Sequence, residues 1–331
     1  MPATIVAVLL LAGCGGSSTT STTSTTTKTA PAAHHQRRAR PQVVDRSLVA
    51  ATAGQLPAGV QWPATAAVGG QVLLMGGLDQ ATASLSDIVN AGPGTARRVG
   101  SLPYAVHDAA GAALGDKAYL FGGGEPSYSD ILAVDPSGQG TTVVGHLPAA
   151  ASDVAAGVIG TTVYVVGGYT GTVPLDTIVA WSGSGTARVV GHLPHPIRYA
   201  AVAAIGGRLI VAGGTSGADA TREVYSFDPA SGGVRQIGLL PHPLTHAVAA
   251  ALGDRVYVIG GRGGLEGTQT SAILAVDPAS GSVRAAGHLP VALSDVGAAT
   301  VGGAVMVAGG RETSGTLSSQ VYLLRPKQGA A

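Results

Sequence analysis

The sequence predicts an all-β protein built from six repeated units. Two short motifs recur in step: a Leu-Pro pair and, twenty residues later, a Gly-Gly pair that ends an apolar run. The Leu-Pro pairs begin at Leu56, Leu102, Leu147, Leu193, Leu240 and Leu289, and the Gly-Gly pairs at Gly76, Gly122, Gly167, Gly213, Gly260 and Gly309. A strand-like repeat of about 46 residues is typical of propeller blades. We therefore expect a six-bladed β-propeller over residues 47–326, followed by a C-terminal tail at 327–331.

The composition agrees with this fold class and excludes others. Glycine supplies 51 of the 331 residues, and charged residues make up only 11%. Neither value suits a helical protein or a disordered one. The formal net charge of +1 gives no support to nucleic-acid binding, which depends on neutralising phosphates. Cys14 is the single cysteine, so an intramolecular disulfide cannot form.

The second unit shows the expected strands most clearly. Gly115-Asp116 makes a turn between its first two strands, and Asp135-Pro136-Ser137-Gly138 makes another before the fourth. Proline presets φ in such a turn, and glycine accepts a positive φ. Short strands separated by turns at this spacing predict four antiparallel strands in each blade. The expected strands of this unit are 108–114, 117–121, 131–134 and a fourth that runs to 146.

The first strand of each unit is rich in Ala and Gly, as in the segments DAAGAAL, YAAVAAI and HAVAAAL. The strand nearest the axis of a propeller is crowded by its counterparts, and larger side chains would overpack it. The second strands, such as 163–166 and 256–259, carry the larger apolar side chains. This gradient in size predicts that the first strands face the axis.

The ends of the repeat region are out of phase in a way that predicts ring closure. The last unit stops after a third strand at 320–324. The segment 47–53, before the first Leu-Pro pair, resembles the fourth strands of the other units. We expect this segment to supply the outer strand of the sixth blade, because closure buries edges that would otherwise stay open.

The N-terminus has the pattern of an export signal. The apolar run 4–12 is shorter than the roughly 20 residues that a membrane span needs, and it fits the apolar core of a secretory signal. It ends in Leu11-Ala12-Gly13-Cys14, which resembles the lipobox of bacterial lipoproteins. In that family the cysteine receives a diacylglycerol and becomes the new N-terminus. The resemblance implies that 1–14 is a signal peptide and that Cys14 is lipidated. An exported protein follows, held at the outer surface of the cytoplasmic membrane or facing the periplasm. A plain signal peptide with an incidental cysteine is the alternative.

Residues 15–46 predict a flexible tether. The stretch 15–29 is almost entirely Ser, Thr and Gly, so it has no apolar surface whose burial could offset the entropy of ordering. Its length suits a linker that holds a domain away from a membrane. The basic cluster HHQRRAR at 34–40 is either a solvated part of this linker or a weak attractor for anionic headgroups or wall polymer.

The units resemble kelch repeats. That family has a Tyr three residues before Gly-Gly, an acidic residue before the third strand, an Asp-Pro turn, and commonly an Arg after the Pro. The matching positions are Tyr119, Tyr164 and Tyr257, then Asp87 and Asp130, then Asp135, Asp228 and Asp277, and Arg198. The resemblance extends over about 280 residues. The usual fourth-strand Trp is missing, because Trp62 and Trp181 lie elsewhere in the unit, and this implies smaller contacts between blades.

Any binding site is expected on one face of the propeller. In such blades the loops from strand four to strand one and from strand two to strand three emerge together. The loops after Gly-Gly are the long ones here. Loops carried by a rigid scaffold are the usual location of binding residues, so we place the site around the channel mouth on this face.

Two rings of side chains follow from this register. The positions before the first strands and just after Gly-Gly vary between units, which suits a binding surface better than a structural role. The alternative is that they are solvated loop residues and strand caps, the three equivalent Asp residues above all. The ligand-binding candidates are Trp62, His107, Asp108, Asp153, Tyr169, Arg198, Tyr199, His246, Asp295 and Arg311.

No metal or other cofactor is expected. His146, His192 and His288 share one slot in three units, which indicates packing or a turn, and His192 with His195 lacks the further ligands of a metal site. Copper radical oxidases of the galactose oxidase kind need a Cys-Tyr crosslink. The sole cysteine, assigned to the lipid, argues against that activity.

Two functional hypotheses remain from the sequence. The first is a recognition module of the cell envelope that binds a carbohydrate or a protein on the long-loop face. Aromatic residues make up only 4% of the chain, so stacking platforms for sugars are sparse and a protein partner stays open. The alternative is a sugar mutarotase or epimerase, because bacterial sialic-acid mutarotases are also six-bladed kelch proteins with acid/base groups at the channel mouth. That resemblance implies four catalytic candidates: Glu125, Asp153, His246 and Arg262.

Overall fold

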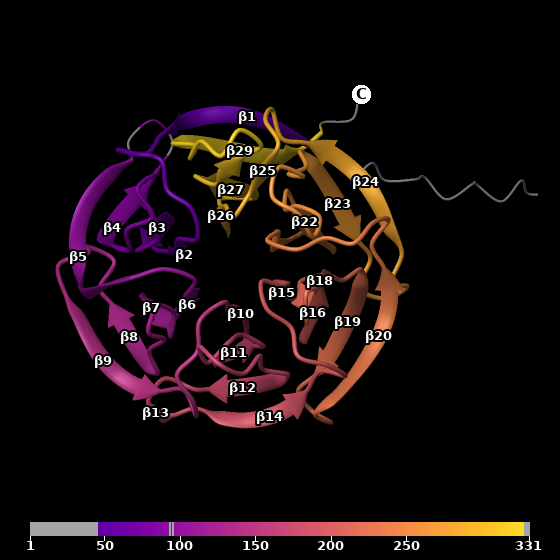
Figure 1. The fold of residues 1–331 in the computed structure, drawn as a ribbon, viewed down its shortest axis with the longest axis horizontal. Helices are drawn as coiled ribbons and strands as arrows, with labels where there is room; N and C mark the ends of the chain where they lie inside the picture. The colour runs from indigo at the N-terminus through magenta and orange to yellow at the C-terminus, as the bar shows by residue number, and fades with distance from the viewer. Residues whose placement is uncertain (1–45, 93, 95, 328–331) are drawn as a thin grey trace, which may run out of the picture. The chain divides into compact units, whose positions relative to one another are not determined.

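The computed structural model describes residues 46–92, 94 and 96–327, and they form six antiparallel sheets around a central axis (Figure 1). The predicted all-β, six-bladed propeller is thus confirmed. Among the described residues no helix is long and apolar enough to cross a bilayer. The predicted signal peptide, Cys14 and the tether to residue 45 lie outside the described residues, as does the end of the tail at 328–331.

Each blade has four strands, which run in sequence order from the axis outward in blades 1 to 5, whereas the outermost strand of blade 6 is the N-terminal β1. Blade 1 comprises β2 (Ala64–Val68), β3 (Gln71–Met75), β4 (Leu85–Ala91) and β5 (Arg97–Val106). Blade 2 comprises β6 (Ala110–Leu114), β7 (Lys117–Phe121), β8 (Asp130–Val134) and β9 (Thr141–His146). Blade 3 comprises β10 (Ala155–Ile159), β11 (Thr162–Val166), β12 (Thr177–Trp181) and β14 (Arg188–His192).

The second half of the ring repeats this arrangement. Blade 4 comprises β15 (Ala201–Ile205), β16 (Arg208–Ala212), β19 (Glu223–Asp228) and β20 (Gly233–Leu239). Blade 5 comprises β21 (Val248–Leu252), β22 (Arg255–Ile259), β23 (Ala272–Val276) and β24 (Val283–His288). Blade 6 comprises β26 (Gly297–Val301), β27 (Ala304–Ala308), β29 (Gln320–Pro326) and β1 (Leu48–Gln55).

Three further pairings involve short strands of two residues, and one of them joins neighbouring blades. β13 (Gly185–Thr186) of blade 3 pairs in parallel with β9 of blade 2. On the long-loop side, β17 (Thr215–Ser216) pairs with β18 (Asp219–Ala220), and β25 (Leu293–Ser294) pairs with β28 (Arg311–Glu312). The innermost strand of blade 2 begins at Ala110, two residues later than predicted, because Asp108 belongs to the turn described below.

The N-terminal strand closes the ring as the repeat phase predicted. β1 pairs antiparallel with β29, from Leu48 opposite Pro326 to Gln55 opposite Gln320. The start of this segment is also fixed to blade 5. The side chain of Arg46 forms an ion pair of 2.7 Å with Asp254, and the Tyr257 hydroxyl donates to the carbonyl of Arg46 at 2.9 Å. The segment from Arg46 to Gln55 therefore forms the outer strand of blade 6 and is also bonded to blade 5.

The hydrophobic core lies between blades rather than in one central mass. The interface of blades 2 and 3 shows the pattern: Trp181 of β12 packs edge-on against Phe121 of β7, with ring centroids 5.6 Å apart. Tyr119, at the kelch Tyr position, meets the same indole at 5.0 Å. Five further clusters of buried residues repeat this layout around the ring. Side chains from two blades fill each interface, so the ring is held by neighbour-to-neighbour burial.

The outer strands approach the next blade through glycine, where a typical kelch repeat has Trp. A methyl group added to Gly238 of β20 would collide with the carbonyl of Gly281 in the turn of blade 5. The same relation holds for Gly100 with Gly138 and for Gly145 with Gly185. Backbone thus touches backbone at these positions, and a side chain of any size would separate the blades.

We predict that Gly238→Ala destabilises the propeller by about 1–3 kcal/mol, the usual cost of overpacking. The matched control is Gly140→Ala, because a methyl group there meets only Asp135 Cβ at an ordinary 3.6 Å. Urea denaturation followed by circular dichroism measures both variants. Equal stability of Gly238→Ala and Gly140→Ala would show that the close approach between blades does not constrain the fold.

Candidate functional site

Six equivalent residues, one from each blade, stand two residues before the innermost strands. Their backbones all adopt the left-handed conformation, with φ between 53° and 61°. Residues other than glycine seldom adopt this conformation, which costs on the order of 1–2 kcal/mol each. We call these residues the axial ring: Trp62, Asp108, Asp153, Tyr199, His246 and Asp295.

Backbone hydrogen bonds connect the axial ring from blade to blade. The N–H of Asp153 donates to the carbonyl of Asp108 at 2.8 Å, and the N–H of Tyr199 donates to Asp153 at 3.2 Å. The series continues from His246 to Tyr199, from Asp295 to His246 and from Trp62 to Asp295, at 3.3, 3.0 and 2.9 Å. The strained turns are therefore locked together.

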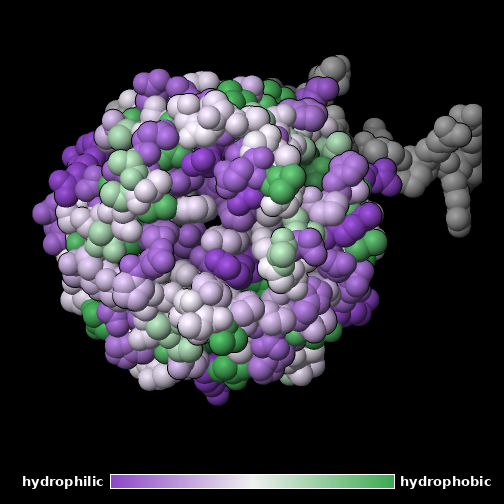
Figure 2. Space-filling view, viewed as in Figure 1, coloured by the Kyte–Doolittle hydropathy of each residue, from purple (hydrophilic) through white to green (hydrophobic). Residues whose placement is uncertain are grey.

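The axial ring surrounds a cavity of about 160 Å³ in the channel, whose walls are Ala, Gly and Val of the inner strands. Trp62, Tyr199 and His246 also line a second cavity of about 300 Å³, which lies among the long loops with Thr215 and Arg262. Figure 2 shows the hollow at the centre of the face, bordered by hydrophilic residues. The ring is thus the boundary between an open mouth and an apolar channel.

Aromatic rings form one side of this boundary. The rings of Tyr199 and His246 stack with centroids 3.9 Å apart, and the indole of Trp62 lies 6.3 Å from Tyr199. Next to them, the guanidinium of Arg198 lies 4.1 Å from the centroid of the Tyr169 ring and donates to the Tyr199 hydroxyl at 3.1 Å. Trp62, Tyr199 and His246 present these aromatic surfaces to the cavity, and Arg198 contacts Tyr199 from outside its lining.

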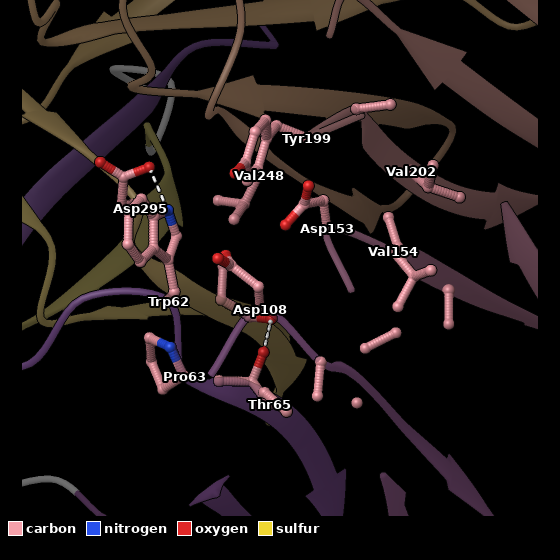
Figure 3. A pocket seen from close by; sticks show the side chains of 18 of the residues that line it. Trp62, Pro63, Thr65, Asp108, Asp153, Val154, Tyr199, Val202, Val248 and Asp295 are labelled. Carbon is pink, nitrogen blue, oxygen red and sulfur yellow. Dashed lines mark hydrogen bonds between the residues drawn. The ribbon is translucent and has the colours of Figure 1, made fainter. Parts of the chain in front are cut away.

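The three carboxyl groups of the axial ring have different partners (Figure 3). Asp153 accepts a charge-assisted hydrogen bond of 2.5 Å from Arg198 Nε. Asp295 accepts from Trp62 Nε1 and from the Ser294 hydroxyl, both at 2.6 Å. The carboxyl of Asp108, whose side chain is only 7% exposed, makes no hydrogen bond with any described residue. Its nearest basic atom is Nε2 of His107, at 3.9 Å.

Burial raises the pKa values of all three carboxyl groups. Burial raises the pKa of Asp108 well above its ordinary value, the nearby charges of Asp153 and Asp295 add to that, and the charge of Arg198 opposes it. Burial raises the pKa of Asp295 to about 6, against the opposing hydrogen bonds from Ser294 and Trp62. The pKa of Asp153 is raised by burial, and Arg198 opposes the rise.

Burial lowers the pKa values of the two histidines near the cavity, His246 and His107. Burial, with smaller contributions from Arg262 and Arg198, lowers the pKa of His246 to about 3, so this ring is neutral at physiological pH. Burial also lowers the pKa of His107. His107 contacts the Ser84 hydroxyl at 2.8 Å, and His246 contacts Thr245 Oγ1 at 3.0 Å. One cavity therefore holds the carboxyl groups, whose pKa values are raised, and the imidazole of His246, whose pKa is lowered.

A network of charges forms the outer part of the mouth. Arg262 lies 3.3 Å from His246 Nε2 and 3.3 Å from the carboxylate of Glu266. Arg311, from the next blade, reaches the same Glu266 at 3.2 Å. The sequence reasoning missed Glu266, although it stands in the long loop after the fifth Gly-Gly, in a chain with few charges. Its carboxylate joins two blades across the mouth.

The structure brings most of the predicted residues together. The six residues of the axial ring line the channel cavity, Arg262 lines the mouth, and His107, Tyr169, Arg198 and Arg311 contact these or their neighbours. Glu125 is exposed, close enough to His107 for its charge to act on that imidazole, but it lines neither cavity. The four catalytic candidates therefore do not form one constellation.

Two of the other described histidines, His146 and His192, each pair with an Asp of their own blade. His146 pairs with Asp130 at 3.2 Å and His192 with Asp176 at 3.1 Å, in each case between the fourth strand and the start of the third. Within the described part of the chain, no group of three or more His, Cys, Asp or Glu side chains is arranged to hold a metal ion.

Comparison with known proteins agrees with this architecture. The sequence model of the KLHDC2/KLHL20/DRC7 Kelch-repeats domain matches residues 106–310, which is more than half of the chain. The chain belongs to the kelch-repeat family, and the predicted resemblance is confirmed.

A solved structure titled "Structure of YjhT" superimposes with a TM-score of 0.70, covers 82% of this chain and 96% of its own, and is 14% identical. At that identity the likeness shows the fold alone. No curated protein matches the sequence.

We predict that Asp295→Asn removes a pH-dependent loss of stability. Because the folded-state pKa of about 6 lies above the ordinary 3.8, the contribution of this group is full below about pH 3.8 and is lost as the pH rises through about 6. Asparagine keeps an acceptor for Trp62. The stability of the variant relative to wild type should rise by ~3 kcal/mol between pH 3.5 and 7.5.

Denaturant unfolding of both proteins across this pH range gives the difference directly. His246 is present in both proteins, and its lowered pKa acts in the opposite direction: its contribution is present above about pH 6.5 and is lost as the pH falls. A stability difference that does not vary with pH would contradict the assignment.

Proposed function

We propose that this propeller is a recognition module that binds a small carbohydrate ligand at the mouth of its channel. The observation that carries the proposal is the axial ring, which directs two aromatic side chains, a neutral histidine and three carboxyl groups into one cavity. A concave site with a few converging polar groups is the usual form of a small-ligand pocket. Aromatic faces offer contact with the C–H faces of a sugar, and the carboxyl groups offer partners for its hydroxyls.

The size of the mouth favours a small ligand. Its volume of about 300 Å³ is at the lower end of small-molecule sites and suits one or two sugar rings. A protein ligand is the other form of the recognition hypothesis. Leu265 and Val173, which are 74% and 56% exposed on long loops of the same face, would be its contacts. Isolated exposed apolar residues are common on protein surfaces, so the cavity carries more weight.

A second candidate function is acid/base catalysis on a sugar, as in a mutarotase or epimerase. The observation that favours it is the opposite displacement of pKa values in one cavity, raised for Asp108 and Asp295 and lowered for His246. Such divergence is frequent at catalytic sites. In anomerisation an acid would protonate the ring oxygen while a base removes the proton of the anomeric hydroxyl. The C–O ring bond opens and closes again on the other face.

We place the module at the cell envelope. The basis is the signal pattern and the lipobox-like segment that ends at Cys14, followed by the Ser/Thr-rich stretch. In this proposal the lipid on Cys14 holds the chain at the membrane, and residues 15–46 give the propeller reach toward envelope carbohydrate or an envelope protein.

We predict that monosaccharides bind to the wild-type protein and that Tyr199→Ala weakens binding at least about tenfold, because one wall of the mouth is lost. Saturation-transfer NMR with a monosaccharide panel measures this. Asp116→Asn, an exposed change in a turn of blade 2 between β6 and β7, is the control and should leave binding intact.

Exchange NMR on the same samples separates binding from catalysis. Anomer exchange faster than in buffer, and abolished by His246→Ala, would establish the catalytic alternative. Binding without acceleration would establish the recognition module. The absence of any sugar signal, together with capture of an envelope protein by the long-loop face, would replace the carbohydrate by a protein ligand.

We predict that Cys14→Ser abolishes lipid attachment. The wild-type chain, expressed in a bacterial host and labelled with an alkyne fatty acid, should carry the label and sediment with membranes, since only the thiol accepts the diacylglycerol. The Cys14→Ser chain should be unlabelled and soluble. Label that persists in Cys14→Ser would contradict the anchor.

A further inference from the structure

The channel cavity has an imbalance of charge. Its lining includes the three carboxyl groups of the axial ring but no Lys or Arg. The alanines, glycines and valines of the inner strands form the remaining wall, so the carboxyl groups face a largely apolar space. A carboxylate in such surroundings needs a hydrogen-bond donor or a cation to offset the lost hydration.

The three groups are compensated to different degrees. Asp153 has a full counter-charge in Arg198. Asp295, whose side chain is 1% exposed, is held by the neutral donors Trp62 and Ser294. Asp108 has neither, although more than nine-tenths of its side chain is buried, and Figure 3 shows its carboxyl directed into the open space of the cavity. This carboxyl is therefore open to a partner that enters the cavity from outside the chain.

The basic groups around the cavity are already engaged. Arg198 lies on Asp153 and on the Tyr169 ring. Arg262 contacts His246 and Glu266, and Arg311 contacts Glu266 as well. His107 and His246 are the nearest imidazoles, and burial disfavours the charged form of both. No basic side chain among the described residues is hydrogen-bonded to Asp108, and Arg198, whose charge acts on it, is bonded to Asp153 instead.

The aromatic side chains make the same space suitable for a cation. Trp62 and Tyr199 line both the channel cavity and the mouth. The negative faces of indole and phenol rings attract ammonium groups, most strongly where water is excluded. Carboxyl groups and aromatic rings thus act on a cation in the same direction, whereas an anionic group would be repelled by both.

We propose that the channel cavity takes a primary ammonium group, with Asp108 as its counter-ion, so that the ligand of the mouth is an amino sugar with a free amine. This inference rests on the proposed function and narrows its ligand from carbohydrates in general to cationic ones. The sugar ring would occupy the mouth beside Trp62 and Tyr199, and the amine would reach past the axial ring. An ammonium has three donors, which matches a site that presents acceptors.

Binding of this kind is coupled to a proton. Burial, together with the charges of Asp153 and Asp295, raises the pKa of Asp108 and so favours its protonated form, and Arg198 opposes that rise. Pairing with an ammonium requires its ionised form. Capture of the amine therefore releases a proton from Asp108, whereas a neutral sugar that hydrogen-bonds to the protonated acid would release none.

Calorimetry with three sugars of the same ring size tests the inference. Glucosamine carries the free amine, N-acetylglucosamine masks it, and glucose lacks it; methylammonium serves as the bare cation. At pH 7.0 in phosphate and in Hepes, whose ionisation enthalpies differ, we expect glucosamine to bind at least about tenfold more tightly than the two neutral sugars. We also expect glucosamine binding to release protons, whereas binding of the two neutral sugars should release none.

Asp108→Asn should abolish both the preference and the proton release, and Asp116→Asn should retain both. A thermal melt shows whether Asp108→Asn is folded. If it is not, the affinities of the wild-type protein for glucosamine, N-acetylglucosamine and glucose test the inference without the variant. Equal affinity for the three sugars would overturn the proposal that the cavity binds an amine, while the proposal of a carbohydrate site would stand. Methylammonium binding that depends on Asp108, with none of the sugars bound, would support an ammonium site and overturn the proposal that the ligand is a carbohydrate. No binding of glucosamine or methylammonium would overturn the inference.

Discussion

The left-handed turn before each innermost strand is the constraint on which the site depends. Six copies of this turn are joined by backbone hydrogen bonds around the axis, so each residue at that position is aimed inward whatever its side chain. The conformation is held by the ring and not by the local residue, because bulky residues such as Trp62 and Tyr199 have no intrinsic preference for it. Backbone geometry is repeated six times, and the chemistry differs from blade to blade.

Crowding around the axis gives this ring its electrostatic character. The inner strands are built from Ala, Gly and Val, and outer glycines such as Gly238 let neighbouring blades approach until their backbones touch. A narrow ring leaves a small channel with apolar walls. Carboxyl groups brought to such a place lose hydration, which raises their pKa values, and the imidazole of His246 loses its charge for the same reason.

Repetition made much of this architecture predictable from the sequence. The in-phase Leu-Pro and Gly-Gly pairs determined the blade number, and the missing fourth strand of the last unit indicated closure by the N-terminal segment. The same register located the axial ring without any structure.

Its left-handed backbone could not be predicted, because no glycine marks it, and the first strand of blade 2 was accordingly expected to start at Asp108 instead of Ala110. Pairings between blades, such as Arg198 with Asp153 or Glu266 with two arginines, join residues whose distance depends on ring geometry. Ring geometry also decides that Glu125 is exposed and lines neither cavity, which the sequence alone could not predict.

The most direct test of the account is a crystal structure of the protein soaked with glucosamine. The account predicts that the amine lies in the channel cavity against Asp108, with the sugar ring beside Trp62 and Tyr199 and the six turns still left-handed. A ligand bound elsewhere, or axial-ring side chains that point away from the axis in the crystal, would contradict the claim that one repeated turn builds the site.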